Sequence, residues 1–400
     1  GCGVTPRAGT RPIHVLVALL LGRHSLYQSV CSVAANKVGT VMSQLLQRIE
    51  DELRSVYATS DRGKLLARKS AYLARIGRFE NAKSIVNELR QEFAENNSST
   101  VTIWIMLTEG LIHYYENLSD EAKDRIVRAQ LLSKALGEAD LAATTSAWRA
   151  HMEFERSDFG AMTTSLESAF SFMTPSNLAA QTRVSMVLSD CHFLCGNREK
   201  GQKWFMRGRA TALKEGDQAS IEALLYNKAA FALAWLRAQS CFGVVDSDQL
   251  SLVRLELASA RNLQDMTGIA ALTHVVHLCE ARLLLLEGKY DQGSSKLQLI
   301  RSAAPYGDYN FNQSLIDLEL EYCKHKLDLA RVNEAVPIWS FDSLDIDEQL
   351  IAAWMISEIF SHTADASEFD EISRRLNEKK SEYSRVMLEL RSLLARFENA

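Results

Sequence analysis

Residues 70–82 read SAYLARIGRFENA, and residues 281–293 read ARLLLLEGKYDQG. Each stretch begins with a small residue, has a glycine seven positions later, and has a second small residue five positions after that glycine. Small side chains let two antiparallel helices pack closely, and a residue such as glycine reverses the chain between them. The spacing therefore predicts a helical hairpin at each occurrence.

The same spacing recurs around six anchor positions, with Met162 as the single departure. The anchors are Gly77, Asn117, Ser157, Gly196, Gly288 and Ala330. The first four are 40, 40 and 39 residues apart. Large apolar residues stand nine positions after each anchor, and they are expected to fill the layer between hairpins. The chain is thus predicted to be all-α, built from stacked hairpins with a period of about 40 residues.

The predicted hairpins account for most of the chain. Between Gly196 and Gly288 one anchor is missing, and we interpret residues 240–248 as an insertion that enlarges the fifth turn. We predict a first helix beginning near Met42 and hairpins over 62–93, 101–136, 139–173 and 178–214. The predicted turns lie near 77, 117, 157, 196, 240–248, 288 and 330. A helix over 348–361 and polar capping helices over 366–398 complete the prediction. Residues 42–400 are therefore predicted to form one elongated domain.

Residues 1–41 do not share this register. Arg7 and Arg11 precede an apolar run over 13–21 and small residues around 32–35, which resembles an export signal but is too short to span a bilayer. Three interpretations stay open: a translated or added leader, a true export signal, and a divergent native arm.

Composition excludes several classes of protein. Hydrophobic residues make up 47% of the 400 residues and charged residues 24%, which argues against disorder and against a membrane protein. The formal net charge is −5, so the chain lacks the clustered positive charge that nucleic-acid binding requires. We expect neither a nucleic acid nor a membrane as partner.

The seven cysteines are an odd number and are scattered along the chain. Cys191, His192 and Cys195 could be imagined as metal ligands, as could a second group that includes His274, His277 and Cys279. Because cysteine is among the most buried residue types and no paired Cys-x-x-Cys is present, we interpret these residues as core thiols and expect no metal. Free thiols favour a reducing compartment, and we predict a cytoplasmic location.

The order of small residue, turn glycine, aromatic and small residue resembles the tetratricopeptide repeat, best around Gly77 and Gly288. The resemblance covers about residues 65–339. The period near 40 is longer than the family's usual 34, and the closing proline is missing. The long helices resemble the repeat region of bacterial transcription activators of the maltose-regulator type, without their nucleotide-binding or DNA-binding modules. The resemblance implies a right-handed superhelical solenoid with a concave binding face.

In tetratricopeptide geometry, the first helix of each hairpin lines the concave face. The resemblance implies seven groove residues that could bind a partner, namely Trp104, Tyr115, His151, Arg183, Asp190, Arg282 and Lys324. Aromatic and arginine side chains are the anchors that binding surfaces favour. An equally acceptable interpretation of Trp104 and Tyr115 is that they pack between adjacent hairpins.

Catalytic motifs are missing from the sequence. The segment from Gly196 to Lys203 resembles a phosphate loop, but Gln202 occupies the lysine position and the glycines serve the hairpin turn. We therefore predict a non-enzymatic protein without a cofactor, a bacterial interaction scaffold that binds a protein or peptide on its concave face. The alternative is a regulatory solenoid that senses a small effector near the 240–248 insertion and so controls a partner protein.

Overall fold

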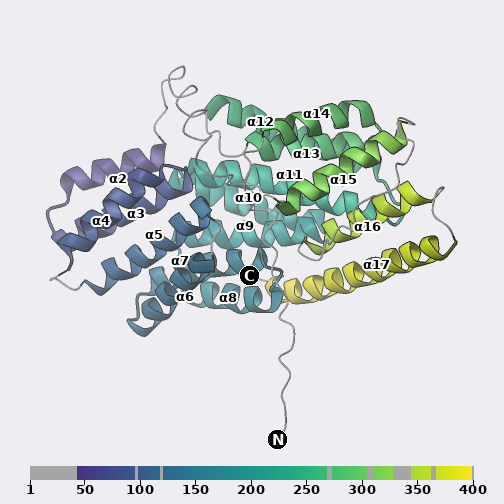
Figure 1. The fold of residues 1–400 in the computed structure, drawn as a ribbon. Coiled ribbons are helices and arrows are strands. Elements are labelled where there is room, and N and C mark those ends of the chain that lie inside the picture. The colour runs from purple at the N-terminus through teal and green to yellow at the C-terminus, as the bar shows by residue number, and fades with distance from the viewer. Residues whose placement is uncertain are drawn as a thin grey trace, which may run out of the picture.

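The computed structural model describes residues 43–94, 98–117, 120–267, 273–303, 310–327, 344–361 and 366–398. Predictions for residues 1–41 and for the turn at Ala330 lie outside this part of the chain. Within it, every regular element is a helix and no strand occurs, which confirms the all-α class (Figure 1). The helices are α2 (Gln44–Ser55), α3 (Thr59–Arg75), α4 (Phe79–Glu92), α5 (Ser99–Asn117), α6 (Asp120–Ala135), α7 (Ala139–Phe154), α8 (Phe159–Phe172), α9 (Leu178–Leu194), α10 (Arg198–Glu215), α11 (Gln218–Ser240), α12 (Ser247–Thr267), α13 (Thr273–Leu286), α14 (Tyr290–Ala303), α15 (Asn310–Lys326), α16 (Ile346–Phe360), α17 (Ala366–Leu394) and the 3₁₀ helix η3 (Ala395–Phe397).

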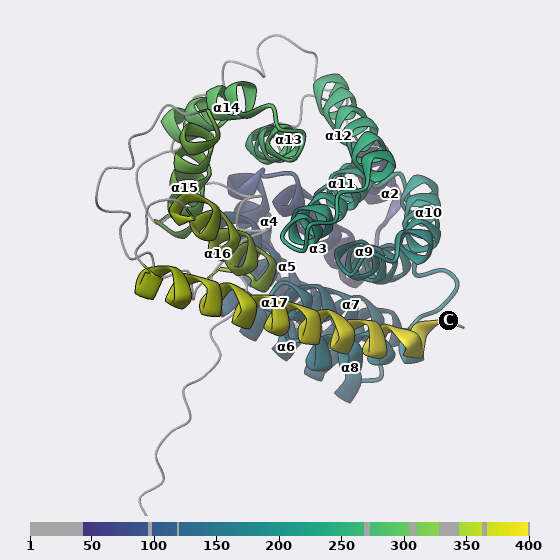
Figure 2. The ribbon, with the colours of Figure 1, turned by 90° about the vertical axis from the view of Figure 1, so that its right-hand side faces the viewer.

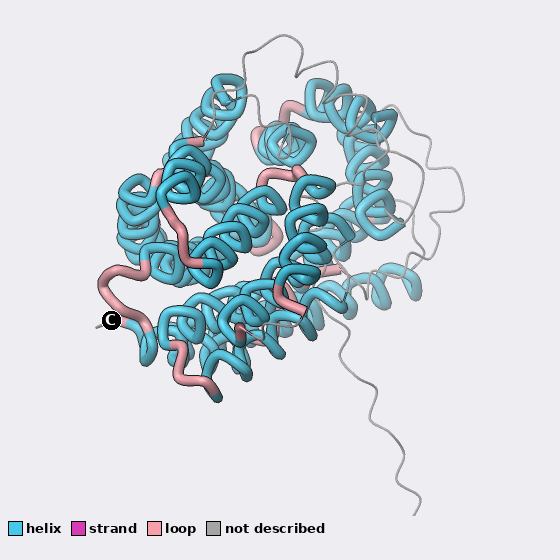
Figure 3. Tube along the Cα trace, turned by 90° about the vertical axis from the view of Figure 1, so that its left-hand side faces the viewer, coloured by secondary structure: helices cyan, strands magenta, loops and turns pink. Residues whose placement is uncertain are grey.

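Consecutive helices pack against one another in chain order, so that α3 with α4, α5 with α6, α7 with α8 and α9 with α10 form the four regularly spaced hairpins. Further pairs follow in α11 with α12 and α13 with α14. Figures 2 and 3 show these helices arranged along a curve, with α9, α11, α13 and α16 on its inner side and α10, α12 and α14 on its outer side. We call the first helix of each hairpin the inner helix and the second the outer helix.

The turns that the structure describes at Gly77, Ser157, Gly196 and Gly288 share one C-terminal cap. At Gly196 the amide of Asn197 donates to the carbonyl of His192 at 2.8 Å, and the amide of Gly196 donates to that of Phe193 at 3.1 Å. Gly196 has φ +78°, a left-handed conformation that glycine adopts at little cost. Ser157 makes the same cap with φ +49°. The reversal is thus produced by local hydrogen bonds at the anchor.

The small residues lie where the inner and outer helices of a hairpin cross. Ser70 Oγ donates to the carbonyl of Ala82 at 2.7 Å, across the turn at Gly77. A Cβ added at Gly110 would lie 2.7 Å from Ile126 Cγ1, and one added at Gly293 would lie 2.3 Å from Leu285 Cδ1. These distances are too short for van der Waals contact, so the helices approach as closely as the missing side chains allow. The predicted role of the small residues is confirmed at these hairpins.

The 240–248 insertion connects α11 to α12 and contacts a distant helix. Phe242 packs against Tyr383 of α17 with ring centroids 6.3 Å apart, and Lys380 lies over the Phe242 ring. Asp246 begins α12, because its Oδ1 accepts hydrogen bonds from the amides of Asp248 and Gln249, each at 3.0 Å. The insertion therefore forms part of the surface against which α17 packs.

The polar end of the chain is a single long helix, α17, and not two. It lies across the array and contacts α8 and α9 (Figure 2). Arg391 donates to the carbonyl of Cys195 at 2.6 Å, and Phe397 stacks on Phe170. The predicted capping helix thus packs back against the third and fourth hairpins.

No helix in the described ranges is long and apolar enough to cross a bilayer.

A side chain at Gly110 should weaken the second hairpin. Gly110→Val would place carbon atoms against Ile126 and the Ala122 carbonyl, so we expect the free energy of unfolding to fall by about 1–3 kcal/mol. Gly160→Ala is the matched control, because nothing lies within 4 Å of a Cβ there. It should leave stability unchanged or raise it by up to about 1 kcal/mol. Urea denaturation followed by circular dichroism measures both, and equal stability of the two variants would contradict the packing.

Candidate functional site

The seven predicted groove residues lie on inner helices, but they differ in exposure. Trp104 and Tyr115 are on α5, His151 on α7, Arg183 and Asp190 on α9, Arg282 on α13, and Lys324 on α15. His151, Arg183, Asp190 and Arg282 are buried, Trp104 and Tyr115 are half-buried, and Lys324 is exposed. Most of these side chains therefore lie inside the array and not along an open groove.

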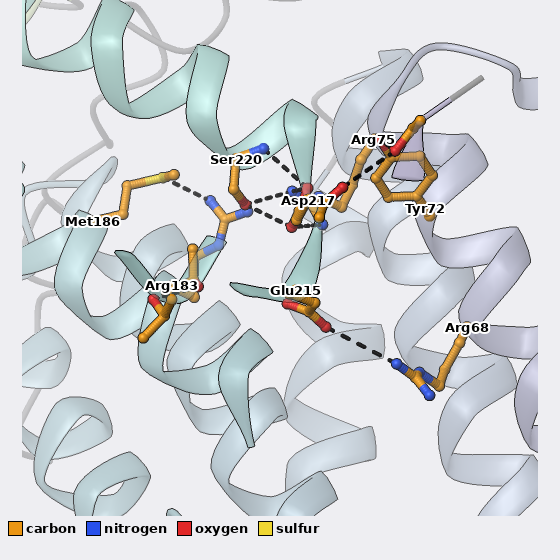
Figure 4. Close-up of polar contacts among 12 residues, drawn as sticks. Arg68, Tyr72, Arg75, Arg183, Met186, Glu215, Asp217 and Ser220 are labelled. Atoms are coloured by element: carbon orange, nitrogen blue, oxygen red, sulfur yellow. Dashed lines mark hydrogen bonds and ion pairs between the residues drawn. The ribbon is translucent and has the colours of Figure 1, made fainter. Parts of the chain in front are cut away.

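An ion pair joins the first inner helix to the start of the fifth. Arg75, at the end of α3, donates through Nη1 and Nη2 to the two carboxylate oxygens of Asp217, at 2.8 and 3.0 Å (Figure 4). Nη2 also donates to Ser220 Oγ at 2.7 Å. Burial alone would raise the pKa of Asp217, but the Arg75 guanidinium outweighs it and the pKa is lowered.

Further hydrogen bonds strengthen this link between the beginning of the described chain and α11. The amide of Leu45, in α2, donates to the carbonyl of Gly216 at 3.1 Å. Tyr72 of α3 donates to Ser43 Oγ at 2.6 Å, and Arg48 Nη1 donates to the carbonyl of Lys214 at 3.2 Å. The beginning of the described chain is thus fastened to the connection between α10 and α11. The inner helices α3, α5, α7, α9 and α11 contact one another in this order, and the Arg75–Asp217 pair links the first to the last. We call the buried side chains packed between these helices the first interior.

Aromatic rings and Arg183 form one wall of the first interior. The Arg183 guanidinium lies 3.6 Å from the centroid of the Trp148 ring, and its Nη1 donates to Met186 Sδ at 3.1 Å. Tyr115 packs edge-on against Trp148, with centroids 6.1 Å apart. Burial lowers the pKa of Arg183, because a guanidinium withdrawn from water loses hydration. Tyr115 and Arg183, two of the predicted groove residues, thus both contact the Trp148 ring.

His151 and Asp190 lie in the same region, and burial shifts the pKa of each toward its neutral form. His151 Nε2 lies 2.8 Å from Glu155 Oε1, but burial lowers the pKa of the imidazole, so the ring is uncharged at neutral pH. Asp190 Oδ2 accepts a hydrogen bond from Asn227 at 2.8 Å, and burial raises its pKa well above the ordinary value.

Arg282 belongs to a second buried cluster, between α11, α13, α15 and α16. Its Nε donates to Glu319 at 2.9 Å and its Nη1 to Glu348 at 3.2 Å, while Arg237 also donates to Glu319. The carboxylates that Arg282 binds are thus those of its own chain. Asp345 and Asp347 are buried beside this cluster.

Lys324 and Trp104 join neither cluster. Lys324 is exposed and pairs with Glu321 on its own helix. Trp104 packs against the apolar core of the first hairpins, in line with the packing interpretation.

The sequence missed Arg75, Asp217, Glu319 and Glu348. Arg75 stands two positions before Gly77, just as Tyr115 stands two positions before Asn117, so the same offset could have found it. The others follow no offset from an anchor, and no sequence signal indicates them.

A separate open cavity of about 460 Å³ lies on the side of α12 that faces α13 and α14. Leu257 and Leu283 are among its apolar lining residues. Its charged rim is paired internally, for example Arg254 with Glu287 and Lys296 with Glu280.

The described residues contain no group of three His, Cys, Asp or Glu side chains placed to hold a metal ion. Their five cysteines are free and buried, and burial raises the pKa of the Cys191 thiol well above its ordinary value. These thiols are therefore poor nucleophiles.

Compared with known proteins, the chain matches no protein-family model and no curated sequence.

Arg75 and Arg183 should differ in their effect on stability. Arg75→Gln leaves the Asp217 carboxylate buried without its counter-ion, and we expect the free energy of unfolding to fall by about 3 kcal/mol. Arg183→Met removes a cation that has no carboxylate partner, so the lost contact with Trp148, worth about 2 kcal/mol, is offset by the relieved desolvation. We expect a change within about 1 kcal/mol. Urea denaturation at pH 7 compares them, and a larger loss for Arg183→Met would contradict the assignment.

Glu348 should give the protein a pH-dependent stability. Burial raises its pKa to about 7, against about 4.3 in an unfolded chain. Between these values the folded state binds more protons, so the contribution of Glu348 is present at low pH and is lost as pH rises through 7. Glu348→Gln keeps an acceptor for Arg282 without the charge. Its stability relative to wild type should therefore rise between about pH 4.5 and 7, by on the order of 3 kcal/mol.

The prediction compares the stability of Glu348→Gln with that of wild type, because buried His151 and His192 have lowered pKa values and make the stability of both proteins rise with pH. Thermal melting of wild type and variant across this pH range measures it. Glu321→Gln, at a partly exposed carboxylate of α15, is the control and should show no such trend. A constant difference between wild type and Glu348→Gln would refute the role of Glu348.

Proposed function

We propose that this chain is a non-catalytic regulatory protein that binds a small effector in the first interior and thereby controls a partner protein. We further propose that its hairpins form a right-handed superhelical solenoid of the tetratricopeptide-like type, with a period near 40 residues. The free, buried thiols of the described residues support a cytoplasmic location.

The closure of α3 onto α11 is the observation that carries this proposal. Arg75 and Asp217 are 142 positions apart, and their bidentate ion pair links the first inner helix to the fifth. Arg183 and Tyr115 pack on Trp148, and Arg183 and Trp148 are buried instead of lying along an open groove. A polypeptide needs an accessible face, whereas a small molecule is best held by an enclosed site with a few polar groups. The enclosed arrangement therefore favours the effector over a peptide at this place.

Coupling to a partner follows from the same closure. A ligand that contacts α7 and α9 in the closed arrangement, and not in an open one, shifts the population toward the closed state. The shift would alter the relative position of hairpins on either side of the Arg75–Asp217 junction. We place the effector there and not at the 240–248 insertion, because Phe242 of the insertion is engaged with α17.

A second candidate function, the polypeptide scaffold, is supported by the surface around α12. The cavity of about 460 Å³ lies between α12, α13 and α14, and Leu252, Leu255 and Met266 of α12 are exposed. Exposed apolar side chains beside a cavity are typical of docking sites for protein segments.

Thermal melting with a panel of metabolites tests the effector proposal. A ligand at one hundred times its Kd should stabilise the folded protein by about 2.7 kcal/mol and raise the melting temperature. In parallel, a photo-crosslinking residue at Leu255 tests the scaffold, with Leu388 on α17 as an equally exposed control. Unchanged melting with every metabolite, together with a stoichiometric crosslink from Leu255 alone, would overturn the effector proposal in favour of the scaffold.

A further inference from the structure

Three arginines among the described residues are less than one tenth exposed: Arg183, Arg237 and Arg282. Arg237 is paired with Glu319, and Arg282 is paired with both Glu319 and Glu348. Arg183 has no carboxylate partner in the described part of the chain, and its polar contact is the sulfur of Met186. It is the exception among the buried cations.

A buried guanidinium without a counter-ion is unfavourable, because the charge has lost water and gained no opposite charge. The face of Trp148 compensates in part through a cation–π contact at 3.6 Å. The thioether of Met186 is only a weak acceptor. Several of the five N–H donors of Arg183 are therefore available to a stronger acceptor.

The neighbouring carboxyl groups do not fill this role. Figure 4 shows Arg183 pointing from α9 toward Asp217 and Ser220, but Arg75 already binds both carboxylate oxygens of Asp217. Asp190 accepts a hydrogen bond from Asn227, and burial raises its pKa well above the ordinary value.

Two further carboxylates lie nearby, and both are bound elsewhere. Glu155 accepts from Tyr114 and lies 2.8 Å from His151 Nε2, and Glu215 is paired with Arg68 at 4.0 Å (Figure 4). Among the described residues, the Arg183 guanidinium therefore has no carboxylate as a hydrogen-bond partner.

We propose that Arg183 binds the carboxylate of a small organic monocarboxylic acid, whose apolar or aromatic part lies against Trp148 and Tyr115. A carboxylate supplies the strong acceptor that Arg183 lacks, and its planar geometry matches the guanidinium fork. A phosphate would bring a second charge into an enclosed aromatic site, where burying it is costly. This inference rests on the proposed effector function and names the class of the effector.

Binding of defined probes to the full chain tests the proposal. The probes are benzoate and butyrate, with benzamide as the uncharged counterpart of benzoate and inorganic phosphate as the alternative anion. Isothermal titration calorimetry and tryptophan fluorescence follow binding. We expect benzoate to bind at least tenfold more tightly than benzamide and phosphate.

Variants at Arg183 locate the site. Arg183→Gln should weaken benzoate at least tenfold and leave benzamide unchanged. Arg183→Lys, which keeps the charge without the fork, should fall between Arg183→Gln and wild type. Arg254→Gln, at an exposed arginine on α12, is the control and should bind benzoate like wild type. If Arg183→Gln does not fold, as judged by circular dichroism, Arg183→Lys carries the comparison.

Equal binding of benzoate and benzamide, preference for phosphate, or benzoate binding that Arg183→Gln and Arg183→Lys leave intact would each overturn the carboxylate assignment. The effector proposal is judged separately by the metabolite panel. A metabolite without a carboxylate that stabilises wild type and Arg183→Gln alike would retain the effector function and refute this inference. If no metabolite of the panel and neither benzoate nor butyrate binds, both the effector proposal and the carboxylate assignment are refuted.

Discussion

The close approach of the two helices in each hairpin is the constraint on which the rest of the structure depends. Gly110, Gly201 and Gly293 lie where an added Cβ would meet a neighbouring side chain at 3.0 Å or less. Ser70 not only fits such a crossing but also satisfies its hydroxyl on the backbone of Ala82. The large apolar residues Ile126, Phe193 and Leu285 pack directly against these glycines and belong to the core.

Tight hairpins stacked along a curve bring the polar residues of the inner helices into a shared interior. Such residues would be solvated in an open groove, but here they must find partners within the chain. Asp217 forms an ion pair with Arg75, and Arg282 forms one with Glu319. Among the described residues, Arg183 contacts the Trp148 ring and the Met186 sulfur but no carboxylate. This missing counter-ion distinguishes the first interior from the second cluster, and it is the reason we propose the ligand there.

Segments far apart in sequence keep the curve closed. Gly216 accepts from the amide of Leu45, and Arg391 near the end of α17 donates to the carbonyl of Cys195. The insertion contributes through Phe242, which packs on α17. A ligand bound as we propose would act on a structure whose distant segments are joined by a few contacts.

The sequence by itself determined the helical class and the turns that the structure describes at Gly77, Ser157, Gly196 and Gly288, because small residues and turn residues act between neighbours within about twelve positions. It also indicated the inner-helix positions of Arg183 and Tyr115, and the same offset contains Arg75. Only the tertiary structure decided that Arg75 meets Asp217, that Arg282 is occupied by Glu348, and that α17 crosses the array. These contacts depend on how each hairpin is rotated relative to the one before it, added up over several hairpins. No local spacing in the sequence indicates this total rotation.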